Sequence, residues 1–123
     1  MREVDLGFIR DWLDTLDKET VSDIFYAVGR LQQVGPTLGR PLVDTITGSR
    51  LKNIKELRSP SSKAPEIRIL FAFDPKRMAI MLVSGDKASG KSRKVKWSGW
   101  YRTAIPDAER LYEEHLKEPR GEK

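Results

Sequence analysis

The chain has 123 residues, with 23 lysines and arginines, 18 acidic residues and a net charge of +5, so its length predicts one domain, 1–123. It contains no cysteine and one histidine, which excludes disulfides and thiolate metal centres, and we expect neither a metal nor a cofactor. No apolar run approaches the roughly 20 residues of a membrane span, and no signal peptide is evident, so we expect a cytoplasmic protein.

Charge is unevenly distributed along the chain. Residues 1–23 hold seven acids and three bases, and residues 107–123 hold six acids and four bases. Residues 24–106 hold sixteen bases and five acids. This basic middle segment predicts a face that binds a polyanion, most often nucleic acid, although a solvated basic surface has the same composition.

The first 34 residues predict two helices that cover one face of a small sheet, after a possible short strand at 2–5. The apolar positions of the first helix are Phe8, Ile9, Trp12, Leu13 and Leu16. Those of the second, which Thr20 would cap and Gly35-Pro36 would end, are Val21, Ile24, Phe25, Val28 and Leu31. We expect Trp12 and Phe25 to pack in the core.

A loop rich in Gly, Pro and Thr follows at 35–50, and it lacks the Gly-Lys-Ser/Thr of a phosphate-binding loop. Residues 51–58 fit both a helix and a strand. We favour a strand, because the turn-forming segment 59–65 would then close a hairpin onto 66–73.

Residues 66–87 predict a second hairpin. Ile67, Ile69, Phe71 and Phe73 alternate with other residues at the period of a strand, and Asp74 to Arg77 form a turn. Residues 78–83 are an apolar run typical of a strand covered on both faces, and 84–87 lead into a cation-rich loop. The three strands would form an antiparallel meander.

Cations and aromatic rings alternate in the flexible arm predicted at 87–102. Cations neutralise phosphates and aromatic rings stack on unpaired bases, so this composition predicts RNA contacts. Alternatively, the tryptophans anchor the arm to the core, and we expect at least one to do so. With one lysine from the meander, the predicted RNA-binding residues are Lys52, Lys91, Arg93, Lys94, Lys96, Trp97, Trp100, Tyr101 and Arg102.

A closing amphipathic helix is predicted from Ile105 to Leu116, with Thr103 as its N-cap, Pro106 in its first turn and a polar tail at 118–123. His115 should lie beside the core rather than in a cleft.

Four segments together resemble the phage-derived Gp49-like, HigB-type branch of the RelE/ParE toxin superfamily: Lys55–Arg58, Glu66–Phe71, Gly85–Lys87 and Trp100–Pro106. The similarity covers residues 8–118. The chain departs from the family pattern in two places. Residues 88–96 look longer and more basic than the corresponding family segment, and the first strand, at 1–5, is short or missing.

The resemblance implies a small α+β, RelE-like fold, with two N-terminal helices packed on a mainly antiparallel sheet of three to four strands and a C-terminal helix. It also implies a cytoplasmic toxin of a type II toxin-antitoxin system that cleaves messenger RNA on the ribosome. Its partner would be a helix-turn-helix, HigA-like antitoxin, with which it could form a heterotetramer.

Metal-free RNA cleavage needs a base for the 2′-hydroxyl, an acid for the leaving oxygen and cations for the phosphorane charge. Arg58 and Arg68 would clamp the scissile phosphate. Lys87, helped by Lys55, would serve as base or charge stabiliser, and Asp86 would orient a cation or accept a proton. Tyr101 and Arg102 would position a base and the RNA backbone.

Three alternatives stay open at this point. Arg58 and Arg68 could pair across strands with Glu56 and Glu66 instead of binding RNA. The chain could be a ParE-like toxin that acts on DNA gyrase, or a basic module that binds RNA or an acidic partner. Cations converging at one edge, from 52–68 and Lys87, favour the nuclease.

Overall fold

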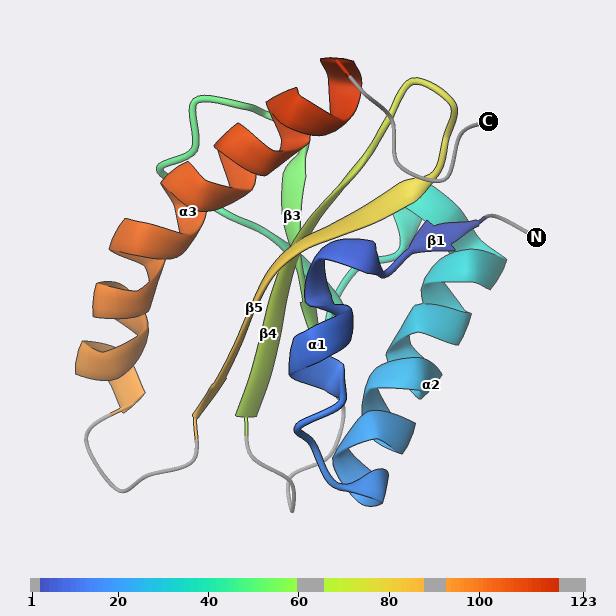
Figure 1. Cartoon of the computed structure of the whole chain (residues 1–123), viewed down its shortest axis with the longest axis vertical. Helices are drawn as coiled ribbons and strands as arrows, with labels where there is room; N and C mark the ends of the chain where they lie inside the picture. Colours follow the sequence, from blue (N-terminus) through green and yellow to red (C-terminus); the bar gives the residue numbers. More distant parts are fainter. Residues whose placement is uncertain (1–2, 60–65, 88–92, 118–123) are drawn as a thin grey trace.

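The computed structural model describes residues 3–59, 66–87 and 93–117, the side chains of Glu66, Asp86, Lys87 and residues 93–98 excepted. A five-stranded sheet lies between helix α3 on one face and helices α1 and α2 on the other (Figure 1). The predicted α+β class is therefore confirmed. No helix in the described part of the chain is long and apolar enough to cross a bilayer.

The sheet has the order β1-β5-β4-β3-β2 and contains two more strands than the predicted meander. The meander itself is present as β3 (Ile54–Arg58), β4 (Glu66–Phe73) and β5 (Ala79–Lys87). Short edge strands extend it on both sides: β1 (Val4–Asp5) pairs parallel to β5, and β2 (Val43–Thr45) pairs antiparallel to β3. Strand β2 lies in the segment that was predicted to be a loop.

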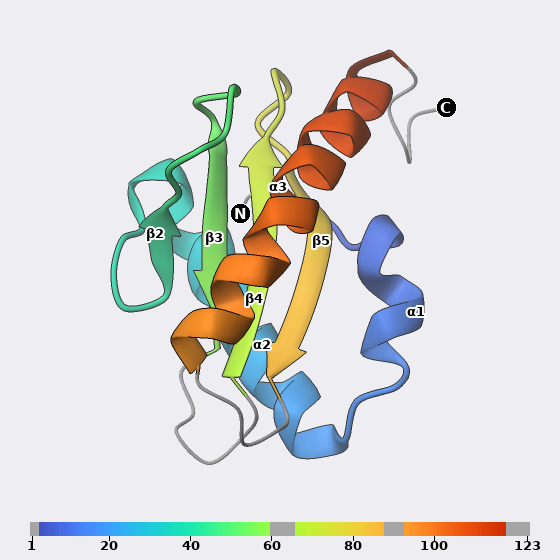
Figure 2. The ribbon, with the colours of Figure 1, turned by 90° about the vertical axis from the view of Figure 1, so that its left-hand side faces the viewer.

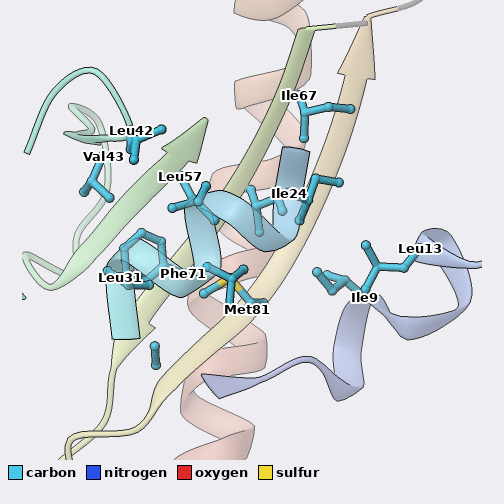
Figure 3. Close-up of a cluster of buried hydrophobic side chains, with 14 residues drawn as sticks. Ile9, Leu13, Ile24, Leu31, Leu42, Val43, Leu57, Ile67, Phe71 and Met81 are labelled. Carbon is cyan, nitrogen blue, oxygen red and sulfur yellow. The ribbon is translucent and has the colours of Figure 1, made fainter. Parts of the chain in front are cut away.

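Both faces of the sheet are covered, so successive residues of β4 enter two different cores. Ile67, Ile69 and Phe71 join Ile24 and Leu31 of α2 (Lys18–Val34) in the first core, which also contains Met81 of β5 (Figure 3). Ile9 and Leu13, from η1 (Gly7–Ile9) and α1 (Arg10–Leu13), close the same core. Leu70 and Ala72 face the second core, which lies under α3 (Arg93–Lys117) and includes Ala104, Ala108 and Tyr112.

Two details of α2 differ from the sequence prediction. Its N-cap is Asp17, whose carboxylate accepts a hydrogen bond from the backbone N–H of Thr20 at 2.8 Å, while Thr20 itself is buried. Phe25 is 45% exposed rather than part of the core. The buried line instead runs through Ile24, Ala27, Val28 and Leu31, and Phe25 lies 100° around the helix from Ile24. After α2 the chain turns through η2 (Gly35–Thr37).

Helix α3 begins at Arg93, twelve residues before the predicted start at Ile105, so residues 93–102 are helical and not a flexible arm. Thr103 is not its N-cap, and Pro106 lies inside the helix instead of in its first turn. A proline there cannot donate to the carbonyl four residues earlier. The packing of Ala104, Ile105 and Ala108 on the sheet offsets this loss. Figure 2 shows α3 running across the strands on this face.

Candidate functional site

A pocket of about 430 Å³ lies where β3 and β4 meet the N-terminal half of α3. Arg58 and Arg68 are directly paired across β3 and β4, so both side chains project from the α3 face of the sheet. Tyr101 of α3 and the segment after β2 complete the wall. The lining residues are Thr45, Ile46, Thr47, Glu56, Arg58, Arg68 and Tyr101.

Glu56 is the centre of the hydrogen-bond network in this pocket. Its side chain is 1% exposed, and it accepts from Arg58 Nε at 2.6 Å and from the Tyr101 hydroxyl. The Tyr101 hydroxyl in turn accepts from an Arg68 guanidinium N–H at 2.6 Å. The predicted alternative of arginine–glutamate pairing is thus present for Glu56, although its closest arginine is on its own strand and Arg68 is 4.0 Å away.

The pKa shifts follow from this network. Burial, and then the hydrogen bond and charge of Glu56, raise the pKa of Tyr101 to about 12, although Arg68 opposes the shift. For Arg58, burial lowers the pKa, but the hydrogen bond and charge of Glu56 outweigh it and the net shift is upward. At neutral pH Tyr101 therefore keeps its proton, beside the guanidinium groups of Arg58 and Arg68.

Trp100 holds the start of α3 against the sheet and so fixes Tyr101. A Cβ atom added at Gly85 of β5 would lie 2.5 Å from Trp100 Nε1, so only glycine leaves room for the indole. The Trp100 and Tyr101 rings meet edge to face with centroids 5.0 Å apart, and Arg68 lies 5.7 Å from the centre of the Tyr101 ring. The expectation that at least one tryptophan anchors the chain is confirmed.

The structure brings together Arg58, Arg68 and Tyr101 from the predicted site, but it separates two of the lysines from them. Lys55 lies on the opposite face of the sheet, where its Nζ donates to the Pro36 carbonyl at 2.9 Å, because neighbouring residues of a strand point to opposite faces. Lys52 is exposed in the turn before β3, whereas Arg58 is the last residue of that strand.

The remaining predicted residues cluster at the same end of the sheet or nearby. Backbone pairing places Asp86 opposite Ile67 and Lys87 opposite Glu66, one and two residue pairs beyond Arg68 and Gly85, so Lys87 occupies a position of the Arg68 face and Asp86 one of the opposite face. Arg102 is exposed on α3, next to Tyr101. The first turns of α3 contain the backbone of Arg93, Lys94, Lys96 and Trp97, whereas Lys91 lies outside the described residues.

His115 lies beside the core, as expected, and outside this pocket. It is 2% exposed, and its Nε2 is 2.9 Å from Asp74 Oδ2 in the β4–β5 turn. Among the residues that the structure describes, no three histidine or acidic side chains are placed to hold a metal ion.

Sequence reasoning missed the central position of Glu56, which it considered only as a surface partner for arginine. The available signal was the spacing, because Glu56 and Arg58 are two residues apart on one strand and must share a face. Nothing in the local sequence indicated the approach of Trp100 to Gly85, which joins elements distant in the chain.

The comparisons with known proteins agree with the predicted resemblance. A family model described as phage derived protein Gp49-like matches residues 11–113. The Mycobacterium tuberculosis protein "Putative toxin HigB2" is 49% identical over 112 residues, which cover 91% of this chain and 53% of that protein. The "Putative toxin HigB3" of the same organism is 40% identical over 113 residues, covering 92% of this chain and 91% of that protein. The chain thus spans about half the length of the first relative and most of the second.

Proposed function

The chain belongs to the family of phage derived Gp49-like proteins, and on this premise we propose that it is a HigB-type toxin that cleaves messenger RNA on the ribosome. The name HigB, which both relatives carry, supports the toxin part of this proposal. The nuclease part rests on the chemistry of the pocket.

The observation that carries the proposal is the pair of guanidinium groups on one pocket wall. Arg58 and Arg68 occupy facing positions on adjacent strands, and both are oriented by the Glu56–Tyr101 network. A planar guanidinium donates two parallel N–H groups to phosphate oxygens, so two of them can hold a scissile phosphate and stabilise the charge of its phosphorane.

In the proposed reaction, a base removes the proton of the RNA 2′-hydroxyl, whose oxygen attacks the adjacent phosphorus as the bond to the 5′-oxygen breaks. An acid protonates that leaving oxygen, so the products are a 2′,3′-cyclic phosphate and a 5′-hydroxyl end. Lys87 serves as the base or as a further charge stabiliser, since it pairs with Glu66, which is two residues from Arg68 and so at a position of the same face of β4. Asp86 pairs with Ile67, at a position of the opposite face, so this scheme gives it no catalytic role.

Glu56 and Tyr101 position the arginines in this scheme. Glu56 is too deeply buried to meet a 2′-hydroxyl directly, and its carboxylate fixes Arg58 and Tyr101. Tyr101, with its raised pKa of about 12, keeps its proton. Its hydroxyl donates to Glu56 and accepts from Arg68, so Glu56 holds Arg68 in place through Tyr101. Exposed Arg102, beside it, contacts the RNA backbone.

The substrate is messenger RNA held by the ribosome. The described pocket contains no histidine, so general acid–base catalysis on free RNA would be weak. A ribosome that fixes the message in a reactive geometry supplies a large proximity effect. The partner that restrains the toxin is a helix-turn-helix, HigA-like antitoxin, and the complex is a heterotetramer.

Mapping of RNA 5′ ends tests this function. The purified chain is incubated with translating ribosomes, and in parallel with the same messenger RNA free in solution. We expect new ends that bear a 5′-hydroxyl, and so require phosphorylation before adapter ligation, in the ribosomal sample and far fewer in the other. Unchanged messenger RNA on ribosomes, together with inhibition of gyrase supercoiling by the same preparation, would replace this proposal with the gyrase alternative.

A further inference from the structure

Two aromatic side chains lie exposed on the solvent face of α2. Phe25 is 45% exposed and Tyr26 57% exposed. In the described residues the third large hydrophobic side chain with comparable exposure is Leu116, on α3 across the sheet. Neighbouring exposed aromatics are an unfavourable arrangement in water and a common feature of interaction surfaces.

Small residues lie one helical turn before and one turn after the two aromatic residues. Ser22 and Gly29 are three or four residues before and after the aromatic pair, so all four share one face of the helix. A Cβ atom added at Gly29 would have no neighbour within 4 Å, so this part of the surface is open. We call Ser22, Phe25, Tyr26 and Gly29 the α2 face. Its shape fits another helix, whose side chains could enter beside the rings.

The charges that flank the α2 face identify the occupant. Glu19 lies near its N-terminal end and Arg30 near its C-terminal end, eleven residues apart, which is about 16 Å along the axis. Eleven residues also span close to three full turns, so both charges lie on the same flank as Tyr26. This order of acid, aromatic and base is complementary to itself when one copy runs antiparallel to another.

We propose that the α2 face binds the α2 face of a second copy of this chain, with the two helices antiparallel. A two-fold axis near Phe25 places the two Phe25 rings against each other and brings each Glu19 beside Arg30 of the second copy. Such an interface is isologous, because each contact occurs twice. Arg30 now donates to Gln33 within its own helix at 2.9 Å, an exposed bond that it can exchange.

The proposal is independent of the cleavage reaction. Helix α2 covers the face of the sheet opposite to α3 (Figure 1), so the pairing leaves the arginine pocket of each copy open. One helix of 17 residues per copy gives a small interface, which by the usual relation of area to stability is transient. We therefore expect a dissociation constant on the order of micromolar.

Sedimentation velocity of the full chain over a dilution series tests the proposal. The wild type should change from monomer to dimer with rising concentration, whereas the double variant Phe25→Ser/Tyr26→Ser should stay monomeric at every concentration. Leu116→Ser is the matched control, because it removes an equally exposed side chain from the other side of the molecule and should leave the equilibrium unchanged. Circular dichroism verifies that each variant is folded.

Charge reversal provides a second, separate test. Glu19→Arg alone or Arg30→Glu alone places like charges together at both ends of the interface and should weaken dimerisation about tenfold. The combination of the two changes restores opposite charges and should return the dissociation constant to near its wild-type value. A chain that is monomeric at several hundred micromolar, or a combined variant no better than the single ones, would overturn the antiparallel pairing.

Discussion

Glutamine in place of Glu56 keeps the size of the side chain but removes the charge that organises the pocket. The native carboxylate accepts from Arg58 Nε at 2.6 Å and from the Tyr101 hydroxyl. Glutamine has one acceptor oxygen, so one of these two donors must face an amide NH₂ group. The variant thus loses at least one charge-assisted hydrogen bond in a site where its own side chain is 1% exposed.

The expected loss of stability is about 2 kcal/mol. A hydrogen bond to a charged group contributes about 1.5–3 kcal/mol, and the Arg58 side chain is 37% exposed, so water replaces part of what it loses. Unfolding entropy of about 2.1 cal/mol/K per residue makes 1 kcal/mol equivalent to about 4 °C for 123 residues. Differential scanning calorimetry should therefore show a melting temperature about 8 °C lower for Glu56→Gln.

Glu114→Gln provides the control, because Glu114 pairs with Arg110 at 2.9 Å on the exposed surface of α3. Exposed pairs contribute at most about 1 kcal/mol and often nothing, so its melting temperature should stay within a few degrees of the wild type. If Glu56→Gln and Glu114→Gln melt at the same temperature, Glu56 does not organise the pocket and the reasoning fails.

Three further substitutions examine the surroundings of the site. Because the pKa of Tyr101 is raised from 10.0 to about 12 in the folded state, the wild type should lose stability as pH rises from 10 to about 12. Tyr101→Phe should lose less stability over this pH range. Denaturant titrations of both proteins at each pH measure the difference in their free energies of unfolding. Gly85→Ala should destabilise the fold by about 1–3 kcal/mol in urea, because its new methyl group would overlap Trp100. Asp74→Ala should cost about 3 kcal/mol in the same assay, since it removes the buried partner of His115 and the acceptor that closes the β4–β5 turn.

Matched controls separate these effects from general sensitivity to substitution. Gly99→Ala, next to Trp100 in open space, should stabilise α3 by up to about 1 kcal/mol. Asp107→Ala, which removes an exposed carboxylate 3.8 Å from Arg110, should change stability by less than about 0.5 kcal/mol. A Gly85→Ala protein as stable as Gly99→Ala would contradict the close packing of Trp100, and equal stability of the two aspartate variants would contradict the buried contact.

The two hairpin strands at the centre of the sheet could be predicted from the sequence, because strands covered on both faces contain long, mostly apolar segments. The alternation at 66–73 and the apolar run after Arg77 correspond to β4 and β5. Strand β2 could not be predicted in the same way. It has three residues, in a segment rich in Gly and Pro, and its pairing with β3 is determined by partners distant in sequence.

The start of α3 was missed for a different reason. Trp97, Trp100 and Tyr101 do have a helical spacing that continues into Ala104 and Ile105, but the many Lys, Arg, Ser and Gly residues around them favoured an arm. The contact of Trp100 with Gly85 and the hydrogen bonds of Tyr101 link this segment to the sheet, and neither contact can be inferred from spacing. These tertiary contacts stabilise a helix that the apolar spacing already allows.

Part of the candidate site could be predicted from strand alternation alone. Alternation places Arg58 and Glu56 on one face of β3 and Lys55 on the other, so a stricter use of the period would have removed Lys55 from the cation cluster. The pairing of Arg58 with Arg68 required the register of the hairpin, which the turn-forming segment 59–65 suggested but did not determine.

The central claim is that the paired arginines hold the phosphate that is cut. The most direct test compares cleavage rates on translating ribosomes for Arg58→Ala, Arg68→Ala and the control Arg50→Ala, which breaks a two-point ion pair with Glu113 outside the pocket. We expect the first two to cut at least about 100-fold more slowly than the wild type, and Arg50→Ala to cut at nearly the wild-type rate. Folded Arg58→Ala and Arg68→Ala proteins that cut as fast as Arg50→Ala would contradict the claim.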